Sequence, residues 1–227
     1  MAIWFRILFE SVIGLWIKGA EKNGTSDEEF LKIISGGQTG VDRGALDAAL
    51  ALQVECGGWC PAGRLAEDGT IPKRYPVVEL PNAGYAERTA RNVDDSNGTL
   101  IISNGEPIGG TRETIDRCIE LNKPHLVIDC ERVQIDEAIE LALGFIHHLS
   151  SRAHARDLAS VRTRPGLRRD PSPSLGMTIV LNVAGPRASQ WPEGHKIAEQ
   201  IVSNVLRRLS GHEGSYEYSA DSPSGDP

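Results

Sequence analysis

The stretch IISGGQTGVDRG (33–44) decides the fold class, because an apolar strand, a glycine-rich turn and a helix follow one another in it. The run FLKIIS (30–35) is typical of a short buried strand. The run 40–53 then has apolar residues at helical spacing, Val41 and Leu46 among them. A strand that enters a helix through a short turn is the repeating unit of α/β proteins.

The same alternation continues along the rest of the chain. Further strands are expected at 54–58, 99–103, 125–130 and 177–185, and further helices at 83–96, 111–122, 135–149 and 195–209. The short run VVEL (77–80) is consistent with an edge strand. This order predicts an α/β fold with a parallel sheet of about five strands and helices on both faces. The stretch 59–76 is too long for a simple turn, and long ordered loops often carry function.

The first 29 residues stand apart from this pattern. The segment WFRILFESVIGLWI (4–17) has apolar residues at helical spacing but contains Arg6 and Glu10. It is shorter than the roughly 20 residues that a membrane span needs. We expect an amphipathic helix that docks on the domain or on a partner, followed by a polar linker. A signal or membrane-surface anchor and an unfolded segment are the alternatives.

The rest of the chain is expected to form a single domain over residues 30–209. The arginine-rich stretch 151–176 predicts an exposed, disordered insertion within it, and residues 210–227 predict a disordered tail. The arginines of the insertion offer contacts for nucleic-acid phosphates or for a partner, as one alternative. The net charge of −7 argues against a nucleic-acid binder, since such proteins are usually basic.

The four cysteines are too few for a disulfide framework in a chain of 227 residues. We expect reduced thiols in a cytoplasmic protein. Cys56 and Cys60 lie four positions apart, which is not a standard zinc spacing, and no second pair follows. The sequence therefore predicts no metal site and no transmembrane span.

Three of the predicted strands end in glycine-containing loops that open helices: GGQTG (36–40), GGT (109–111) and GPR (185–187). In a parallel sheet these loops meet at the same edge, where ligands usually bind. Glycine lets backbone N–H groups approach a ligand, and the first turn of a helix attracts anions. Together the loops favour an anion site, although each alone can be a plain turn. None matches the dinucleotide or P-loop spacing.

The candidate ligand-binding residues come from these loops and from the stretch that follows residue 58. They are Gly36, Gly37, Gln38, Thr39, Gly40, Asp42, Arg43, Trp59, Arg64, Asp68, Gly109, Gly110, Thr111, Gly185, Pro186 and Arg187. Thr39 and Thr111 either donate hydroxyl hydrogen bonds to a ligand or cap their helices. Arg187 offers a planar fork to an oxyanion.

The candidate catalytic carboxylates are Asp42, Glu67, Asp68 and Asp95, because catalysis at such a site needs a carboxylate close to the ligand. Asp42 is equally suited to complementing the dipole of its own helix. Arg88 and Asn92 share a helix face with Asp95, and such polar faces are usually solvated. No Ser/His/Asp or Cys/His triad is apparent in the sequence.

Five motifs in this order resemble the putative molybdenum carrier family, a circularly permuted YpsA-like branch of the SLOG superfamily. The motifs are SGGQTGVDRGALDAAL (35–50), GGWCPAGRLAEDGTIPKRYP (57–76), YAERTARNVDDSNGTLI (85–101), GGT (109–111) and NVAGPRAS (182–189). The resemblance covers residues 31–130 and 178–209. It implies a Rossmann-like domain related to the LOG and lysine-decarboxylase-like proteins, which bind nucleotides or related phosphorylated ligands.

The circular permutation that the resemblance implies makes the last strand central. We predict the strand order 54–57, 31–35, 178–183, 99–103, 125–129. This order places Gly37, Gly110 and Gly185 around one crevice. Because relatives in the superfamily often pair, we also expect a homodimer.

The sequence thus predicts a binding protein for an anionic small molecule, either a nucleotide-like ligand or molybdenum cofactor or molybdate. Trp59, Arg64 and Asp68 would close over the ligand or read its ring. The alternative is a hydrolase that acts on a nucleotide or a nucleotide-derived ligand. The LOG signature PGGxGTxxE has a glutamate implicated in glycosidic cleavage. Thr114 of IGGTRET stands at that position, which argues against phosphoribohydrolase activity.

Overall fold

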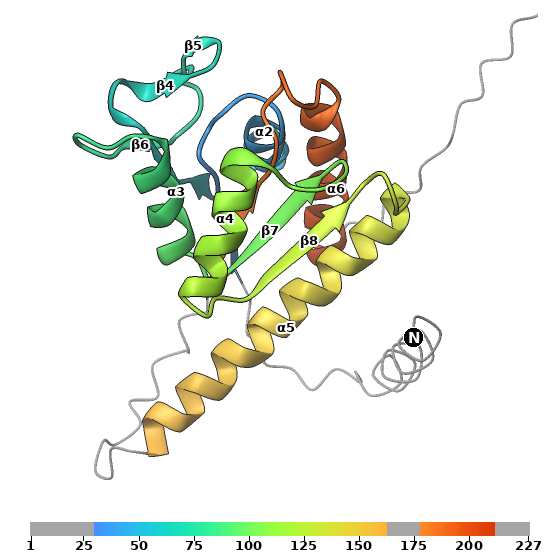
Figure 1. Ribbon diagram of the computed structural model, residues 1–227. Helices are drawn as coiled ribbons and strands as arrows, with labels where there is room; N and C mark the ends of the chain where they lie inside the picture. Colours follow the sequence, from blue (N-terminus) through green and yellow to red (C-terminus); the bar gives the residue numbers. More distant parts are fainter. Residues whose placement is uncertain (1–29, 163–177, 212–227) are drawn as a thin grey trace, which may run out of the picture.

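The computed structural model describes residues 30–162 and 178–211 (Figure 1). The predicted N-terminal helix and nearly all of the predicted tail lie outside these residues. The elements are β1 (Phe30–Ile34), α2 (Val41–Ala51), β2 (Cys56–Gly57), β3 (Trp59–Cys60), η1 (Ala62–Arg64), β4 (Leu65–Ala66), β5 (Gly69–Thr70), β6 (Val78–Glu79), α3 (Tyr85–Asp94), β7 (Gly98–Ser103), α4 (Gly109–Glu120), β8 (His125–Asp129), α5 (Ile135–Arg162), β9 (Thr178–Ala184) and α6 (Gly194–Leu209).

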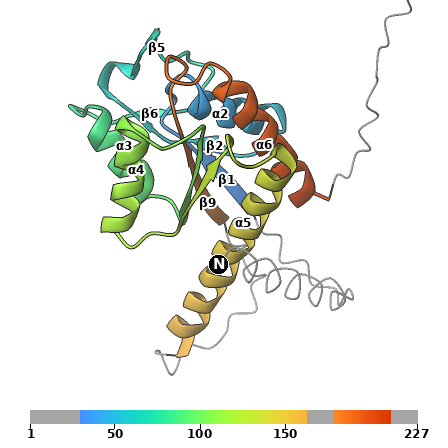
Figure 2. The same cartoon turned by 45° about the vertical axis from the view of Figure 1, so that its right-hand side comes forward.

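The main sheet has five parallel strands in the order β2-β1-β9-β7-β8. The predicted strand order is therefore confirmed, and β9, the last strand of the sequence, lies at the centre (Figure 2). Ile34 of β1 is opposite Asn182 of β9, and Ala184 of β9 is opposite Ile101 of β7. The loops that follow β1, β9 and β7 consequently leave the sheet at the same edge.

The helices cover both faces of this sheet (Figure 1). The connection from β1 to β2 and that from β7 to β8 run away from β9 in opposite directions. Because parallel crossovers are right-handed, their helices α2 and α4 lie on opposite faces. Helices α5 and α6 pack on the α2 side, and α3 packs beside α4. A crevice is expected where the connections diverge, at the carboxyl ends of the strands.

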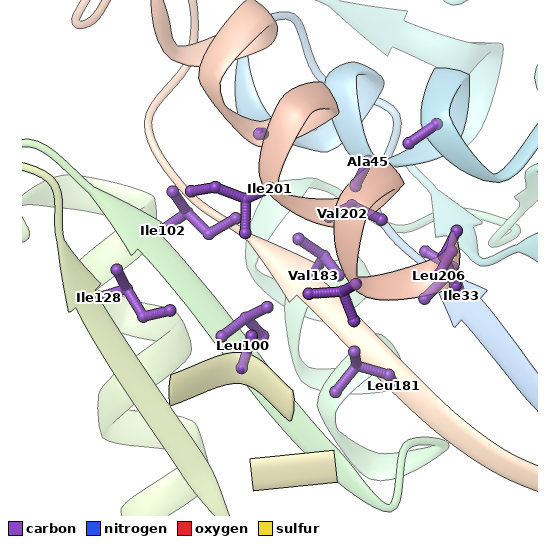
Figure 3. Close-up of a cluster of buried hydrophobic side chains, with 14 of the residues drawn as sticks. Ile33, Ala45, Leu100, Ile102, Ile128, Leu181, Val183, Ile201, Val202 and Leu206 are labelled. Atoms are coloured by element: carbon purple, nitrogen blue, oxygen red, sulfur yellow. The ribbon is translucent and has the colours of Figure 1, made fainter. Parts of the chain in front are cut away.

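The main core lies between the sheet and helices α2, α5 and α6 (Figure 3). Alternate residues of each strand point into it, as Leu100 and Ile102 of β7 do. From the helix side, Ile201 and Val202 of α6 belong to the same buried cluster. Each such side chain contributes about 1.5–3 kcal/mol to stability when fully buried.

Helices α2 and α6 approach each other very closely because small residues face the contact. A Cβ atom at Gly44 would lie 2.2 Å from the carbonyl oxygen of His195. Ala45, Ala48 and Ala198 are fully buried in the same cluster. This contact fixes the starts of α2 and α6, and hence the loops before them, relative to one another.

Residues 59–79 form a folded unit where a long loop was expected. β3 pairs with β6, and β4 forms an antiparallel pair with β5. The predicted strand VVEL thus belongs to a separate two-stranded sheet and is not an edge of the main sheet. A second buried cluster holds the unit against α2 through Leu46, Ile71 and Tyr75.

The end of α5 corrects a prediction. The helix was expected to end at residue 149, but it continues to Arg162. The prediction of a disordered insertion is therefore wrong for residues 151–162, and residues 163–176 lie outside the described part. Ala153, Ala155 and Leu158 are good helix formers, which favours continuation over an exposed loop. No helix in the described ranges is long and apolar enough to cross a membrane.

Candidate functional site

A pocket lies at the carboxyl edge of the sheet, where the loops after β1 and β9 face α3 and the start of α4. Its lining comprises Gln38, Asp42, Tyr85, Arg88, Thr89, Gly110, Thr111, Glu113, Thr114, Ala184, Gly185, Arg187 and Gln190. The pocket has a volume of about 80 Å³, several times what one water molecule requires. This space suits a small oxyanion or a phosphate group.

The first turn of α4 forms one wall of the pocket. Ile108 is the N-cap residue, and no side chain caps this helix. The first backbone N–H groups of a helix have no partner within it, so Gly110 and Thr111 offer donors and a partial positive charge. A Cβ at Gly110 would meet no atom within 4 Å, so the wall is open there. Thr114 donates back to the carbonyl of Gly110 at 2.9 Å, which rigidifies the turn.

Asp42 and Arg88 form a charged pair in the lining. Arg88 Nη1 lies 3.3 Å from Asp42 Oδ2, and the backbone N–H of Gln38 donates to the same oxygen at 3.2 Å. Gly36 makes room for the arginine, because a Cβ there would lie 1.4 Å from Arg88 Nη1. Arg88 Nε is buried and has no hydrogen-bond partner among the described residues. The guanidinium therefore keeps donor capacity beyond its contact with Asp42.

The carboxyl group of Asp42 has an unusual environment for an acid, since its residue is only 3% exposed. Burial raises its pKa, and the charge of Arg88 and the hydrogen bond from Gln38 oppose that rise without cancelling it. A buried carboxyl with a raised pKa in a pocket is a candidate acid or base.

The loop after β9 forms the opposite wall. Ala184, Gly185 and Arg187 line the pocket from this side. The side chain of Arg187 is 46% exposed, and its Nε lies 3.9 Å from the carboxylate of Glu67. Gln38 Oε1 accepts the backbone N–H groups of Thr39 and Glu67, each at 3.0 Å. The amide nitrogen of Gln38 is thus left as a donor, and Gln38 lines the same pocket as Arg187.

Two of the predicted glycines serve chain packing. A Cβ at Gly40 would lie 2.5 Å from the carbonyl oxygen of Pro186, and Gly40 has φ of +78°. A Cβ at Gly185 would lie 2.3 Å from the carbonyl oxygen of Ile102. The loops are also bonded, since the N–H of Ala188 donates to Thr39 Oγ1 at 3.1 Å. The first and third predicted glycine loops therefore pack directly on each other.

Glu67 ties the turn between β4 and β5 to both of these loops. Its carboxylate accepts hydrogen bonds from the Thr39 hydroxyl and from the Ser189 hydroxyl, the latter at 2.5 Å. Burial alone would raise the pKa of Glu67, but the hydrogen bonds from Ser189 and Thr39 outweigh burial and lower it. Glu67 lies outside the pocket lining and acts as a clamp.

Asp68, in the same turn, is also engaged away from the pocket. It receives two hydrogen bonds from Arg43, at 2.6 and 2.8 Å, which lower the pKa of Asp68. Arg43 in turn donates to the carbonyl of Gly37 at 3.1 Å. This bidentate pair holds the β4–β5 turn against the loop after β1.

Trp59, Arg64 and Asp95 have partners elsewhere. Trp59 Nε1 donates to Asp95 at 2.7 Å, and Arg91 stacks over the indole ring at 5.2 Å. Arg64 donates to the backbone carbonyls of Ile71, Pro72, Tyr75 and Val77. Arg64 therefore organises residues 64–77 and has no place in the pocket lining.

The structure brings some predicted residues together and adds others. Of the predicted residues, the lining includes Gln38, Asp42, Gly110, Thr111, Gly185 and Arg187. The prediction omitted Tyr85, Arg88, Thr89, Glu113, Thr114, Ala184 and Gln190 as lining residues. Arg88 was assigned to a solvated face, yet its side chain is only 14% exposed. The sequence signal that could have pointed to Arg88 is its place in the motif YAERTARNVDDSNGTLI.

Among the described residues, no group of three or more His, Cys, Asp or Glu residues could hold a metal ion. All four cysteines are free thiols, and burial raises the pKa of Cys130 to about 11.

Comparison with known proteins agrees with the fold and the motifs. A model of the circularly permutated YpsA SLOG family matches residues 33–159. The crystal structure of a protein from Syntrophus aciditrophicus named "putative molybdenum carrier protein" is 37% identical to this chain. That match covers 78% of this chain and 95% of the other, with a TM-score of 0.64. No curated protein matches the chain. The chain therefore belongs to the circularly permutated YpsA SLOG family.

Proposed function

We propose that this protein binds an anionic small molecule whose negatively charged group lies against the first turn of α4. The main support is that the start of α4 has no side-chain cap and lies beside a pocket that Arg88 also lines. Backbone donors at a helix start and a guanidinium are groups that commonly hold phosphate and other oxyanions. Family membership agrees with small-molecule binding.

The size of the pocket limits which part of a ligand it can enclose. A volume of about 80 Å³ accommodates a phosphate or a similar oxyanion, so a nucleotide would extend beyond it. Tyr85 lines the pocket and is 46% exposed, and so offers a ring to the remainder of such a ligand. A nucleotide-like ligand is therefore our lead.

Molybdenum cofactor and molybdate remain in the proposal, since the solved relative is named for molybdenum. The lining fits the phosphate group of the cofactor, or an oxyanion, through N–H donors from Gly110, Thr111 and Arg88. It does not fit a bare metal cation, because the described residues include no suitable ligand cluster. These chain residues would bind and orient the anion.

Two substitutions of Gly110 test the proposal. Gly110→Asp places a carboxylate in the open space of the pocket, and acidic residues in the first helical turn are stabilising. We expect this variant to fold normally and to lose binding. Gly110→Ala is the matched control, because its methyl group meets no atom within 4 Å. Binding is measured by calorimetric titration with phosphate, a nucleotide panel, molybdate and molybdenum cofactor.

The pair of variants separates binding from folding. We expect wild-type affinity for Gly110→Ala and at least tenfold weaker binding for Gly110→Asp, roughly the effect of losing one charge-assisted hydrogen bond. Equal affinity of the two variants would place the anion elsewhere. Absence of binding of every tested compound to folded wild type at millimolar concentration would refute the proposal.

A second candidate function is hydrolysis of a nucleotide or nucleotide-derived ligand. The supporting observation is Asp42, the one of the four predicted carboxylates that lines the pocket. In this scheme Asp42 accepts a proton from the attacking water. Incubation with a nucleotide panel should release base, sugar or phosphate, and Asp42→Asn should abolish the release while keeping the fold. Intact nucleotides after long incubation with wild type would eliminate this function.

We also propose that the protein is a cytoplasmic homodimer. Relatives in the superfamily often pair, and this is the basis of the proposal. Light scattering behind size exclusion should give twice the chain mass of 24.6 kDa. A mass of one chain at micromolar concentration would contradict it.

A further inference from the structure

The pocket contains acceptors as well as donors. Asp42 and Glu113 line it together with Arg88 and Arg187, so its charged lining residues number two of each sign. The net charge of the lining therefore does not hold an anion there. The affinity must come from N–H donors that point at the anion. The carboxylates, in turn, must lie against ligand groups that can donate hydrogen bonds to them.

In its ionised form, Asp42 is held firmly enough to act as a discriminating acceptor. It is 3% exposed, and Gln38 and Arg88 fix its Oδ2 at 3.2 and 3.3 Å. Glu113 follows Gly110 by three positions on α4 and is exposed at the pocket. A ligand against the start of α4 thus lies within the field of two carboxylates.

Whether an anion binds in this pocket then depends on whether its oxygen atoms carry protons. Sulfate and molybdate carry oxygen atoms without protons, so they offer acceptors only, and a carboxylate repels them. Monohydrogen phosphate has the same charge but carries one O–H, which donates to a carboxylate. A sugar phosphate adds hydroxyl donors beside its phosphate. Facing an acceptor with another acceptor leaves both without a hydrogen bond, which is costly at a buried group.

We infer that the pocket selects an anion that also donates hydrogen bonds, namely phosphate or a sugar phosphate, and rejects the proton-free oxyanions sulfate and molybdate. Asp42 and Glu113 accept the ligand's O–H groups while the start of α4 and Arg88 hold its charge. This inference rests on the proposed function and narrows its ligand class: it removes free molybdate and keeps nucleotides and the phosphate group of molybdenum cofactor.

Three dianions of matched charge provide the test. The full chain is titrated calorimetrically with phosphate, sulfate and molybdate in mildly alkaline buffer, where phosphate is chiefly monohydrogen phosphate. We expect phosphate to bind at least about tenfold more tightly than either of the others, the scale of one unsatisfied charged hydrogen bond. Glu113→Gln should narrow the difference, because an amide both donates and accepts. Glu120→Gln, on the same helix but outside the lining, should leave it unchanged.

The possible outcomes distinguish a failure of this selectivity from a failure of the proposed anion binding. Tighter or equal binding of sulfate or molybdate would overturn the selectivity and leave anion binding standing. If Glu113→Gln keeps the full difference, Asp42→Asn must remove it, or the inference is wrong. Absence of binding of all three anions and of nucleotides to the folded chain would remove both claims. Glu113 is exposed, so its variant remains testable even where Asp42→Asn does not fold.

Discussion

Asp42 shows how one side chain connects the stability of this protein with its pocket. Its carboxyl is buried, and burial disfavours the charged form more than Arg88 and Gln38 favour it. An ionised Asp42 therefore costs stability in the folded state. The residue sits in the pocket despite this cost, which is common for groups that contact ligands.

We predict that Asp42→Asn becomes more stable relative to wild type as pH rises. The folded-state pKa of Asp42 is raised, so the folded protein binds more protons than the unfolded chain between the two pKa values. Wild-type stability therefore falls as pH rises through that window, by about 1.4 kcal/mol for each pH unit between the unfolded and folded pKa values. Urea unfolding of both proteins across acidic to neutral pH measures the difference. A difference that does not vary with pH would contradict the raised pKa.

The sequence predicted some of the lining residues but could not identify Arg88. Gly110 and Gly185 follow predicted strands, and parallel topology alone brings such loops to one edge. Arg88 lies on a helix face with Asn92 and Asp95, a pattern that usually indicates solvent. Only the packing of α3 over Gly36 turns this arginine inward, and no local pattern encodes that contact.

At the scale of elements, the α2–α6 contact is the most demanding. Gly44→Ala places a methyl group 2.2 Å from the His195 carbonyl oxygen, which is backbone and cannot rotate away. We expect a loss of about 1–3 kcal/mol in the free energy of unfolding, as for other overpacked sites. Gly110→Ala, also in a helix, is the control and should not destabilise the protein. Equal midpoints of denaturation for the two variants would refute this close contact.

The Glu67 clamp makes a prediction about acid sensitivity. Glu67→Gln should lose about 1–2 kcal/mol at neutral pH, because charge-assisted hydrogen bonds from Thr39 and Ser189 are weakened. The folded-state pKa of Glu67 is lowered, so its stabilisation is present above the unfolded pKa and is lost as pH falls through the folded pKa. Wild type and variant should converge in acid. Denaturant unfolding at neutral and acidic pH measures this, and a constant gap would contradict it.

Most elements were predictable because their periodicity is strong, but two were not. The arginines after residue 151 resemble a solvated loop, yet α5 continues to Arg162, and the residues between them include good helix formers such as Ala153 and Ala155. Residues 59–79 contain strands of two residues each, too short for any alternation to be recognised. Their order comes from tertiary contacts such as Arg64 with four carbonyls.

At the scale of the whole molecule, circular permutation explains why the site is assembled from distant segments. β9 lies between β1 and β7, so the loop at 185–187 meets the loop at 36–40. Strand periodicity alone predicts a parallel sheet but not which strand is central. The family resemblance supplied that order, and the structure confirms it.

The most direct test of anion binding at α4 is an amide-resolved NMR titration of the full chain with inorganic phosphate. We predict that the largest saturable changes in chemical shift occur at the backbone amides of Gly110 and Thr111, with smaller changes at Gly185. Gly110→Asp should remove these changes, and Gly110→Ala should retain them. Saturable changes confined to other residues, or none at these amides in the folded protein, would contradict anion binding at the start of α4.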